Sequence, residues 1–460
     1  MTFLEPALLV AAGVVISLLA GMFWPARQAA YWCALVFVAA AIVRTLTITG
    51  PNAFWLNSIV GDNYSLIVGL LILAAVMAGL LLAWRPTQYG PEYPALLLLA
   101  GLGGMLMGMA GSLILMFLGL ELLSLPLYIL AASQRTLLGG EAGLKYLLIG
   151  AFSSGILLFG MALLYGATGS VAFVDYTAIQ TVPGLLAAGL ALTMVGLIYK
   201  LAVVPFHMWV PDVYQGAPTP VTAFMAFGTK VAAAAALLRL MALGFSLSTG
   251  WWGELLGYLA VLTMLAGSLL ALPQTNLKRL LAWSGIGNAG YVLVGIASHN
   301  MEGAEAALFY LVPYGLAILL AFGVIYMLEG SEGSVEYENL RGVAYRQPWL
   351  AAAFLVAMLS LAGIPLTAGF IGKFYLIQGA LASNDWGLAI GLVLATVLGL
   401  AVYFRPVQAM FTPGEGADVH WNVGGAIVVA AAAVFTLAVG IYPEPIFHLV
   451  TQSARFTWLH

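Results

Sequence analysis

The chain has 460 residues, of which 63% are apolar and only 7% charged, whereas roughly a quarter of a soluble domain is charged. Lipid must therefore solvate most of the chain, and we expect an integral membrane protein without a soluble domain. The net charge of −3 and the scattered Lys and Arg residues offer no basic face, which excludes nucleic acid as a partner. Cys33 is the single cysteine, so this chain alone cannot build a disulfide or an iron–sulfur cluster.

Runs of roughly 20 apolar residues are typical of transmembrane helices. The chain contains about fourteen such runs, which predicts an all-α polytopic membrane protein. In chain order they lie near residues 5–24, 30–49, 63–84, 94–110, 112–132, 143–166, 183–206, 219–244, 252–272, 277–298, 305–329, 348–382, 386–411 and 422–449. The segment 348–382 is too long for one straight helix, and we expect it to be broken.

The loop cations predict the orientation, because Lys and Arg in short loops mark the cytoplasmic side. Counted over these segments, the odd-numbered loops hold Arg27, Arg85, Arg135, Lys278, Arg279, Arg341, Arg346 and Arg405. The even-numbered loops hold no Lys or Arg, so both termini are predicted to lie on the periplasmic side. The only sizeable cytoplasmic loop is predicted from Glu329 to Arg346.

Several charges remain within the predicted helices or at their ends: Arg44, Glu121, Lys145, Lys200, Lys230, Arg239 and Lys373. A charge at the centre of a transmembrane helix costs about 2.5 to 3.5 kcal/mol on insertion scales, so such residues usually face a wet or protein-lined interior. Lysine suits proton transfer because its proton affinity responds to its surroundings, whereas arginine stays charged. The alternative for each lysine is a static ion pair or a side chain that reaches the membrane surface. We favour that alternative for Arg44.

The first predicted helix break lies in the run KLAVVPFHMWVPDVYQGAPTPVTAFM, from Lys200 to Met225. Pro205 lacks a backbone N–H and therefore frees the carbonyl of Leu201, which is next to Lys200. His207 follows the proline and has either a structural role at the break or a place on a proton route.

The second predicted break lies in SLAGIPLTAGFIGKFY, from Ser360 to Tyr375. Pro365 frees the carbonyl of Leu361 in the same way, shortly before Lys373. Broken helices at membrane depth are tolerated only where protein or water covers the freed groups, and they mark ion sites in transporters. A simple proline kink is the alternative. A break in each half also hints at an internal repeat.

Five segments together resemble the antiporter-like subunits of respiratory complex I, most closely the family of N subunits of bacterial NADH:quinone oxidoreductase. They are LGLELLSLPLYIL (118–130), EAGLKYLL (141–148), the run from Lys200, QTNLKRLLAWSGIGNAGYVLVG (274–295) and the run from Ser360. The resemblance extends over residues 95 to 410, and the run from Lys200 is its most specific part.

The resemblance implies a fold in which helices 4–8 and 9–13 form two inverted five-helix repeats, with helices 7 and 12 broken. The expected divisions are an N-terminal three-helix segment (1–93), a first repeat (94–250), a second repeat (251–411), and a C-terminal helix and tail (412–460).

The resemblance also assigns the site. Glu121 matches the family's fifth-helix glutamate, Lys200 the lysine of broken helix 7, Lys230 the lysine of helix 8 and Lys373 the lysine of broken helix 12. Lys145 lies in the family's sixth-helix segment, with a less settled role. We hypothesise that Glu121 pairs with Lys200, that Lys200 exchanges a proton with Lys230, and that Lys373 passes the proton out.

One departure concerns helix 10, where Asn288 stands at a position that is often histidine in the family. Asparagine cannot titrate near neutral pH. A path between Lys230 and Lys373 would then need water or the hydroxyl groups of Ser284, Tyr291 and Tyr314 as bridges.

The resemblance implies that this chain itself binds no cofactor or metal. NADH, flavin, iron–sulfur clusters and quinone are expected in the other membrane and peripheral subunits of the complex, and the location is expected to be a bacterial inner membrane. The alternatives are a sodium/proton antiporter subunit on the same fold, a purely structural membrane subunit, and a solute carrier that acts alone. The last alternative calls for a central pocket with polar groups, of which the sequence shows few.

Overall fold

The computed structural model describes residues 2–23, 28–48, 53–55, 58–84, 89–134, 136–176, 184–245, 251–329 and 335–456. Twelve of its helices are long and apolar enough to cross a membrane. They are α1 (Glu5–Phe23), α2 (Gln28–Thr47), α3 (Asn63–Leu82), α5 (Leu113–Ala131), α6 (Leu137–Thr168), α7 (Gly184–Leu201), α9 (Thr219–Gly244), α10 (Trp251–Ala271), α11 (Leu277–Ala297), α12 (Met301–Leu328), α17 (Trp386–Phe411) and α18 (Val423–Ile441). The predicted all-α membrane fold is confirmed.

Two further apolar helices are shorter, α4 (Glu92–Gly108) and α15 (Pro348–Ala362). They coincide with predicted spans, but the full count of fourteen crossings stays a prediction, as do the inverted repeats and the division into segments. A turn separates α15 from α16 (Ala368–Ala382).

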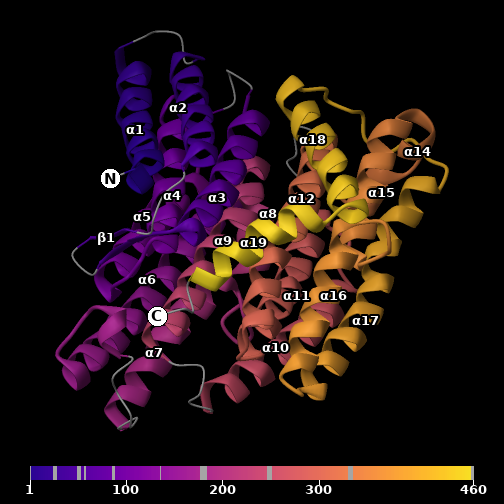
Figure 1. Cartoon of the computed structure of the whole chain (residues 1–460). Coiled ribbons are helices and arrows are strands. Elements are labelled where there is room, and N and C mark those ends of the chain that lie inside the picture. Colours follow the sequence, from indigo (N-terminus) through magenta and orange to yellow (C-terminus); the bar gives the residue numbers. More distant parts are fainter. Residues whose placement is uncertain are drawn as a thin grey trace.

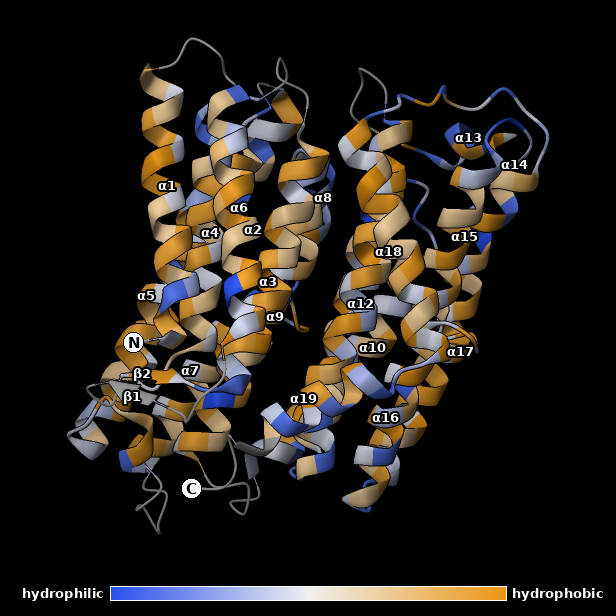
Figure 2. Ribbon diagram, turned by 45° about the horizontal axis from the view of Figure 1, so that its top comes forward, coloured by the Kyte–Doolittle hydropathy of each residue, from blue (hydrophilic) through white to orange (hydrophobic). Residues whose placement is uncertain are grey.

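The helices fall into two groups, buried inner helices and exposed outer helices. Every residue in the apolar window of α9 is buried, and α11 and α12 are nearly as enclosed. The outer helices expose large apolar side chains instead, for example Phe152 of α6 and Val36 of α2. Figure 2 shows these outer helices mostly in the colour of hydrophobic residues, as expected for surfaces that face lipid.

Both predicted helix breaks are present. After α7 the chain makes an irregular turn that passes through Pro205, and a short helix, α8 (Val210–Gly216), follows it. The turn between α15 and α16 contains Pro365. Ala202 and Leu366 have positive φ angles of 71° and 72°, a backbone conformation that interrupts helix geometry in each turn.

The prediction of one helix over residues 422–449 is wrong at its end. α18 ends at Ile441, and a separate helix, α19 (Glu444–Phe456), follows. Pro443 explains the interruption, because the residue before a proline is driven out of the helical conformation, and Tyr442 is indeed non-helical. α19 crosses the bundle diagonally in Figure 1 and packs against α12 and α3.

Several small elements were not predicted. The hairpin of β1 (Ala53–Trp55) and β2 (Ile59–Gly61) lies between α2 and α3. The 3₁₀ helices are η1 (Thr2–Leu4) and η2 (Phe173–Tyr176), and the short helices α13 (Tyr337–Leu340) and α14 (Val343–Arg346) lie in the loop after α12. These elements are too short for a periodic pattern to reveal them.

The described loop cations gather at one end of the bundle. Asn276 donates to Glu336, and Arg346 forms an ion pair with Asp418, so the loops before α11, after α12 and before α18 meet there. Arg27, Arg85 and Arg135 lie outside the described residues. The side of the membrane on which this loop end lies stays a prediction.

Two arginines of the membrane helices form ion pairs. Arg44 bonds Glu5 and joins α2 to α1, in agreement with the static role favoured for it. Arg239 is fully buried and forms two hydrogen bonds to Asp62, at 2.5 and 2.9 Å, and a third to the carbonyl oxygen of Gly108 at 2.8 Å. This pair fastens α9 to the start of α3 and to the end of α4.

Substituting one partner of the Arg239 pair should destabilise the bundle. Asp62→Ala leaves a buried guanidinium without its carboxylate, at an expected cost of about 3 to 5 kcal/mol. We expect little folded protein in the membrane and a lower unfolding temperature for what remains. The double variant Asp62→Ala with Arg239→Met removes both charges and should recover most of the lost stability. Equal instability of the single and double variants would contradict this explanation.

Candidate functional site

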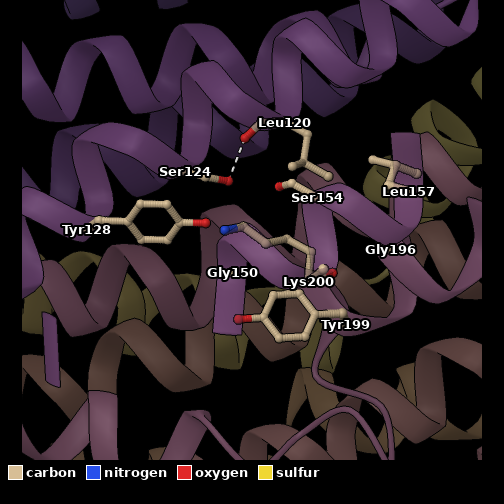
Figure 3. Close-up of a pocket in the computed structure, with 10 residues that line it drawn as sticks. Leu120, Ser124, Tyr128, Gly150, Ser154, Leu157, Gly196, Tyr199 and Lys200 are labelled. Atoms are coloured by element: carbon tan, nitrogen blue, oxygen red, sulfur yellow. Dashed lines mark hydrogen bonds between the residues drawn. The ribbon is translucent and has the colours of Figure 1, made fainter. Parts of the chain in front are cut away.

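Lys200 lies in the last turn of α7 and is 2% exposed. Its Nζ donates to the hydroxyl oxygen of Tyr146, on α6, over 2.9 Å. The nitrogen also lies 4.7 Å from the centre of the Tyr146 ring and 5.5 Å from that of Tyr128, on α5. Figure 3 shows the side chain extended toward Tyr128. Aromatic faces and one hydroxyl group therefore stabilise the ammonium group.

The hypothesis that Glu121 pairs directly with Lys200 is not supported by the geometry. Among the described residues no ion pair joins the two side chains, and Glu121 instead accepts a hydrogen bond of 2.5 Å from the hydroxyl of Ser154. Ser154 and Tyr146 both belong to α6, so this helix supplies a partner to each charged group.

Lys230 forms a hydrogen bond with the backbone at the helix break after α7. Its Nζ donates to the carbonyl oxygen of Leu201 over 2.9 Å, and the side chain is 2% exposed. This carbonyl is the one that Pro205 leaves without a helical donor. A lysine of α9 thus satisfies a backbone group of α7, immediately after Lys200.

Lys373 repeats this arrangement at the second break. Its Nζ donates to the carbonyl oxygens of Leu361 and Ala362, over 2.9 and 3.2 Å. Pro365 leaves the Leu361 carbonyl without its helical donor. The ammonium group also lies 4.7 Å from the ring centre of Tyr291. Each break is therefore covered by a buried lysine.

A buried network of hydrogen bonds lies between the two breaks. Tyr310 donates to the Asn288 side-chain oxygen over 2.6 Å, and the Asn288 amide donates to the Ser284 carbonyl over 2.8 Å. The hydroxyls of Ser284 and Tyr403 are 2.7 Å apart, and that of Tyr291 is 3.1 Å from the Thr396 hydroxyl. Next to this network is a cavity with room for about one water molecule (about 10 Å³), lined in part by Ser284, Asn288 and Tyr403.

Gly285 marks where this network approaches Lys230. A Cβ atom placed on Gly285 would lie 3.2 Å from the Tyr314 hydroxyl and 3.5 Å from Cε of Lys230. The Tyr314 hydroxyl donates to the carbonyl of Ala226, one turn before Lys230 on α9. Of the predicted bridges, Ser284, Tyr291 and Tyr314 therefore lie between the two lysines, together with Asn288.

Two predicted residues lie apart from this line. Lys145 is 39% exposed and forms ion pairs with Glu141 and Asp212, both at 2.6 Å, so it belongs to a charged cluster at the loop end. His207 packs against Trp283 with ring centres 5.3 Å apart, and its buried Nδ1 has no partner among the described atoms. The geometry gives neither residue a contact with the buried lysines.

The sequence did not reveal several residues of the site, among them Tyr146, Ser154, Tyr310 and Tyr403. Tyr146 is adjacent to Lys145, but successive residues of a helix point about 100° apart, and only the tyrosine faces Lys200. A buried tyrosine hydroxyl usually has a hydrogen-bond partner. Tyrosines inside apolar helices were therefore the available signal, but that signal does not identify their partners.

Known proteins identify the family of this chain. Residues 110–399 match the family described as NADH:quinone oxidoreductase/Mrp antiporter, transmembrane. The NADH-quinone oxidoreductase subunit N of Trichlorobacter lovleyi is 40% identical over 459 residues, which cover 95% of this chain and 93% of the relative.

Solved structures show the same likeness. A chain of respiratory complex I from Thermus thermophilus, with bound aureothin, matches with a TM-score of 0.87 and 36% identity over 98% of this chain and 100% of its own length. A chain of the Mrp complex from a Dietzia species has a TM-score of 0.88 at 23% identity, over 99% of this chain and 98% of its own, which shows the shared fold alone. This chain therefore belongs to the NADH:quinone oxidoreductase/Mrp antiporter transmembrane family and is similar to the N subunits of NADH-quinone oxidoreductase.

Proposed function

We propose that this chain is the N-type membrane subunit of a proton-translocating NADH:quinone oxidoreductase and that protons pass along its buried lysines. The family and the relatives named as subunit N support the subunit assignment. The observation that carries the residue-level proposal is that a buried lysine covers each helix break, with a hydrogen-bonded network between the two. The chain is part of an enzyme, and the redox steps with NADH, flavin, iron–sulfur clusters and quinone belong to partner subunits.

The first transfer runs from Lys200 to Lys230. The two side chains are linked by a single residue of the break, because Leu201 follows Lys200 in the chain and its carbonyl binds Lys230. A hydrogen bond from a charged ammonium is stronger than one from a neutral amine. Loading or unloading Lys230 therefore changes how firmly the break of α7 is held, which couples the proton to the backbone there.

The second transfer runs from Lys230 to Lys373. Tyr314 lies beside Lys230, and Tyr291 lies under the ammonium group of Lys373. Between them, Asn288 both donates and accepts hydrogen bonds, so it orients the hydroxyls of Ser284 and Tyr310 without titrating. Hydroxyls and the water that fits the adjacent cavity then carry the proton.

Glu121 is proposed to adjust Lys200 from α5. Energy released by quinone reduction elsewhere in the assembly would change the charge or position of Glu121, and the field at Lys200 would change with it. The location that fits this function is a bacterial inner membrane, with both termini in the periplasm and the loop end in the cytoplasm.

Sodium/proton antiport is the second candidate because Mrp antiporters share the fold. Sodium needs free oxygen ligands, and the carbonyls freed at both breaks already accept hydrogen bonds from lysine ammonium groups. A cation at either break would have to displace a positive charge. The geometry therefore favours protons.

The main test compares Lys200→Met with the wild type in the complete assembly, reconstituted in sealed vesicles. We expect proton uptake and coupled electron transfer to fall together by at least about tenfold, because methionine fills a similar volume but carries no proton. Thr193→Val is a matched control, since Thr193 is also buried on α7 and its hydroxyl has no partner among the described atoms. Unchanged pumping in the Lys200 variant would make this chain a structural subunit.

Tyr146→Phe tests the contact with the ammonium of Lys200. The change removes one hydrogen bond to a charged group, worth about 1.5 to 3 kcal/mol, and keeps the ring. We expect proton uptake about tenfold slower, with normal amounts of assembled protein. Tyr199→Phe should have no such effect, because the buried Tyr199 hydroxyl has no partner among the described atoms. Equal rates for the two variants would remove Tyr146 from the path.

Asn288→Leu tests the network between the two breaks. It deletes the hydrogen bonds to Tyr310 and Ser284 at nearly constant volume, and we expect proton uptake to slow several-fold while the subunit still assembles. Ser268→Ala is the control, because Ser268 lines the same cavity but bonds to backbone carbonyls instead. Wild-type uptake in Asn288→Leu would place the route elsewhere.

A further inference from the structure

A second buried lysine pair lies outside the site described above. Lys278, in the first turn of α11, is 1% exposed and donates to the carbonyl oxygen of Ala217 over 2.8 Å and to a carboxylate oxygen of Glu329 over 3.3 Å. Glu329 directly follows α12 and its side chain is 8% exposed. The hydroxyl of Thr219, in the first turn of α9, donates to its other oxygen over 2.6 Å. Three helix ends thus meet at one ion pair.

The burial of Lys278 is unusual for a charge at the end of a helix. Its neighbour Arg279 is 30% exposed and pairs with Asp212 in the charged cluster at the loop end. Holding two ions away from water is costly, and apolar residues of similar size would pack there at no such cost. A function that needs a titratable pair at this place explains why charged groups occupy it.

The pair is aligned with Lys230 along two helices. On α11, Gly285 lies seven residues after Lys278, which is two turns and about 10 Å along the same face, and its Cβ position is beside Lys230. On α9, Thr219 and Lys230 share a face with Ala226, whose carbonyl accepts the Tyr314 hydroxyl. The pair therefore lies between the loop end of the bundle and Lys230.

We propose that the Lys278–Glu329 pair is the entry through which protons from the loop end reach Lys230, an inference that rests on the proposed function. The Glu329 carboxylate takes a proton from water at the loop end. The Lys278 ammonium gives one of its protons, through the Tyr314 hydroxyl or water, to the neutral amine of Lys230, and the Glu329 carboxyl group then returns a proton to Lys278. One proton has moved inward, and both members of the pair regain their starting charges.

A purely structural pin is the rival explanation, because the pair also ties together the ends of three helices. Arginine distinguishes the two roles. It keeps a positive charge and donates to both Ala217 and Glu329, but it does not release its proton. Lys278→Arg should therefore preserve a pin and block an entry.

The experiment uses the complete assembly with Lys278→Arg in sealed vesicles, with electron transfer, proton uptake and the amount of assembled subunit all measured. We expect normal assembly and proton uptake at least about tenfold slower. Arg279→Lys, the adjacent exchange in the opposite sense, is the control and should behave as the wild type, since lysine can still pair with Asp212. Wild-type uptake in Lys278→Arg would overturn the entry.

Glu329→Gln is the second variant, and it decides the matter if Lys278→Arg does not assemble. Glutamine still accepts from Thr219 but takes up no proton, so uptake should fall to the same extent. Wild-type uptake in this variant also overturns the entry. Lys200→Met is measured alongside. If it pumps normally, the proposed function itself fails; if it is inactive while both entry variants pump normally, only the entry is wrong.

Discussion

The structure of the site depends on backbone carbonyls that proline leaves without a donor inside the membrane. An unsatisfied carbonyl in lipid costs several kcal/mol, so each break must find a hydrogen-bond donor nearby. Lys230 supplies one at Leu201, and Lys373 supplies one at Leu361. The requirement is mutual, because a buried ammonium group also needs acceptors. The lysine removes the cost of the unsatisfied carbonyl, and the carbonyl reduces the cost of burying the ammonium group. This explains why a helix break and a lysine occur together twice in one chain.

α6 provides the second constraint, because it supplies a hydroxyl partner to each charged group of the candidate site. Ser154 binds Glu121 and Tyr146 binds Lys200, so neither charge is locked to the other. A direct buried ion pair would be hard to open, because each ion would lose its partner in a low dielectric. Here each charged group instead binds a neutral hydroxyl group of α6. This arrangement is compatible with the proposed release of a proton from Lys200.

The sequence predicts those features that depend on residues close to one another in the chain. Pro205 and Pro365 mark breaks because a missing N–H acts on the carbonyl four residues earlier, and Lys200 is recognisable because a charge in an apolar run is rare. It did not reach the partners, because Tyr146 and Ser154 meet the site only through the packing of α6 against α5 and α7. The direct contact of Glu121 with Lys200 was wrong for the same reason. The spacing of residues along one helix does not show which side chain of a neighbouring helix will contact them.

Arginine and the lysines of the candidate site take two different roles in this bundle. The arginines are fixed by carboxylates: Arg239 makes two bonds to Asp62 and a third to a carbonyl, and Arg44 pairs with Glu5. Among the described residues, Lys200, Lys230 and Lys373 instead bind neutral oxygens, from a phenol or from the backbone. A neutral acceptor does not oppose the loss of the proton as a carboxylate would. Lys278 differs from these three lysines, because it binds both the carbonyl of Ala217 and the carboxylate of Glu329.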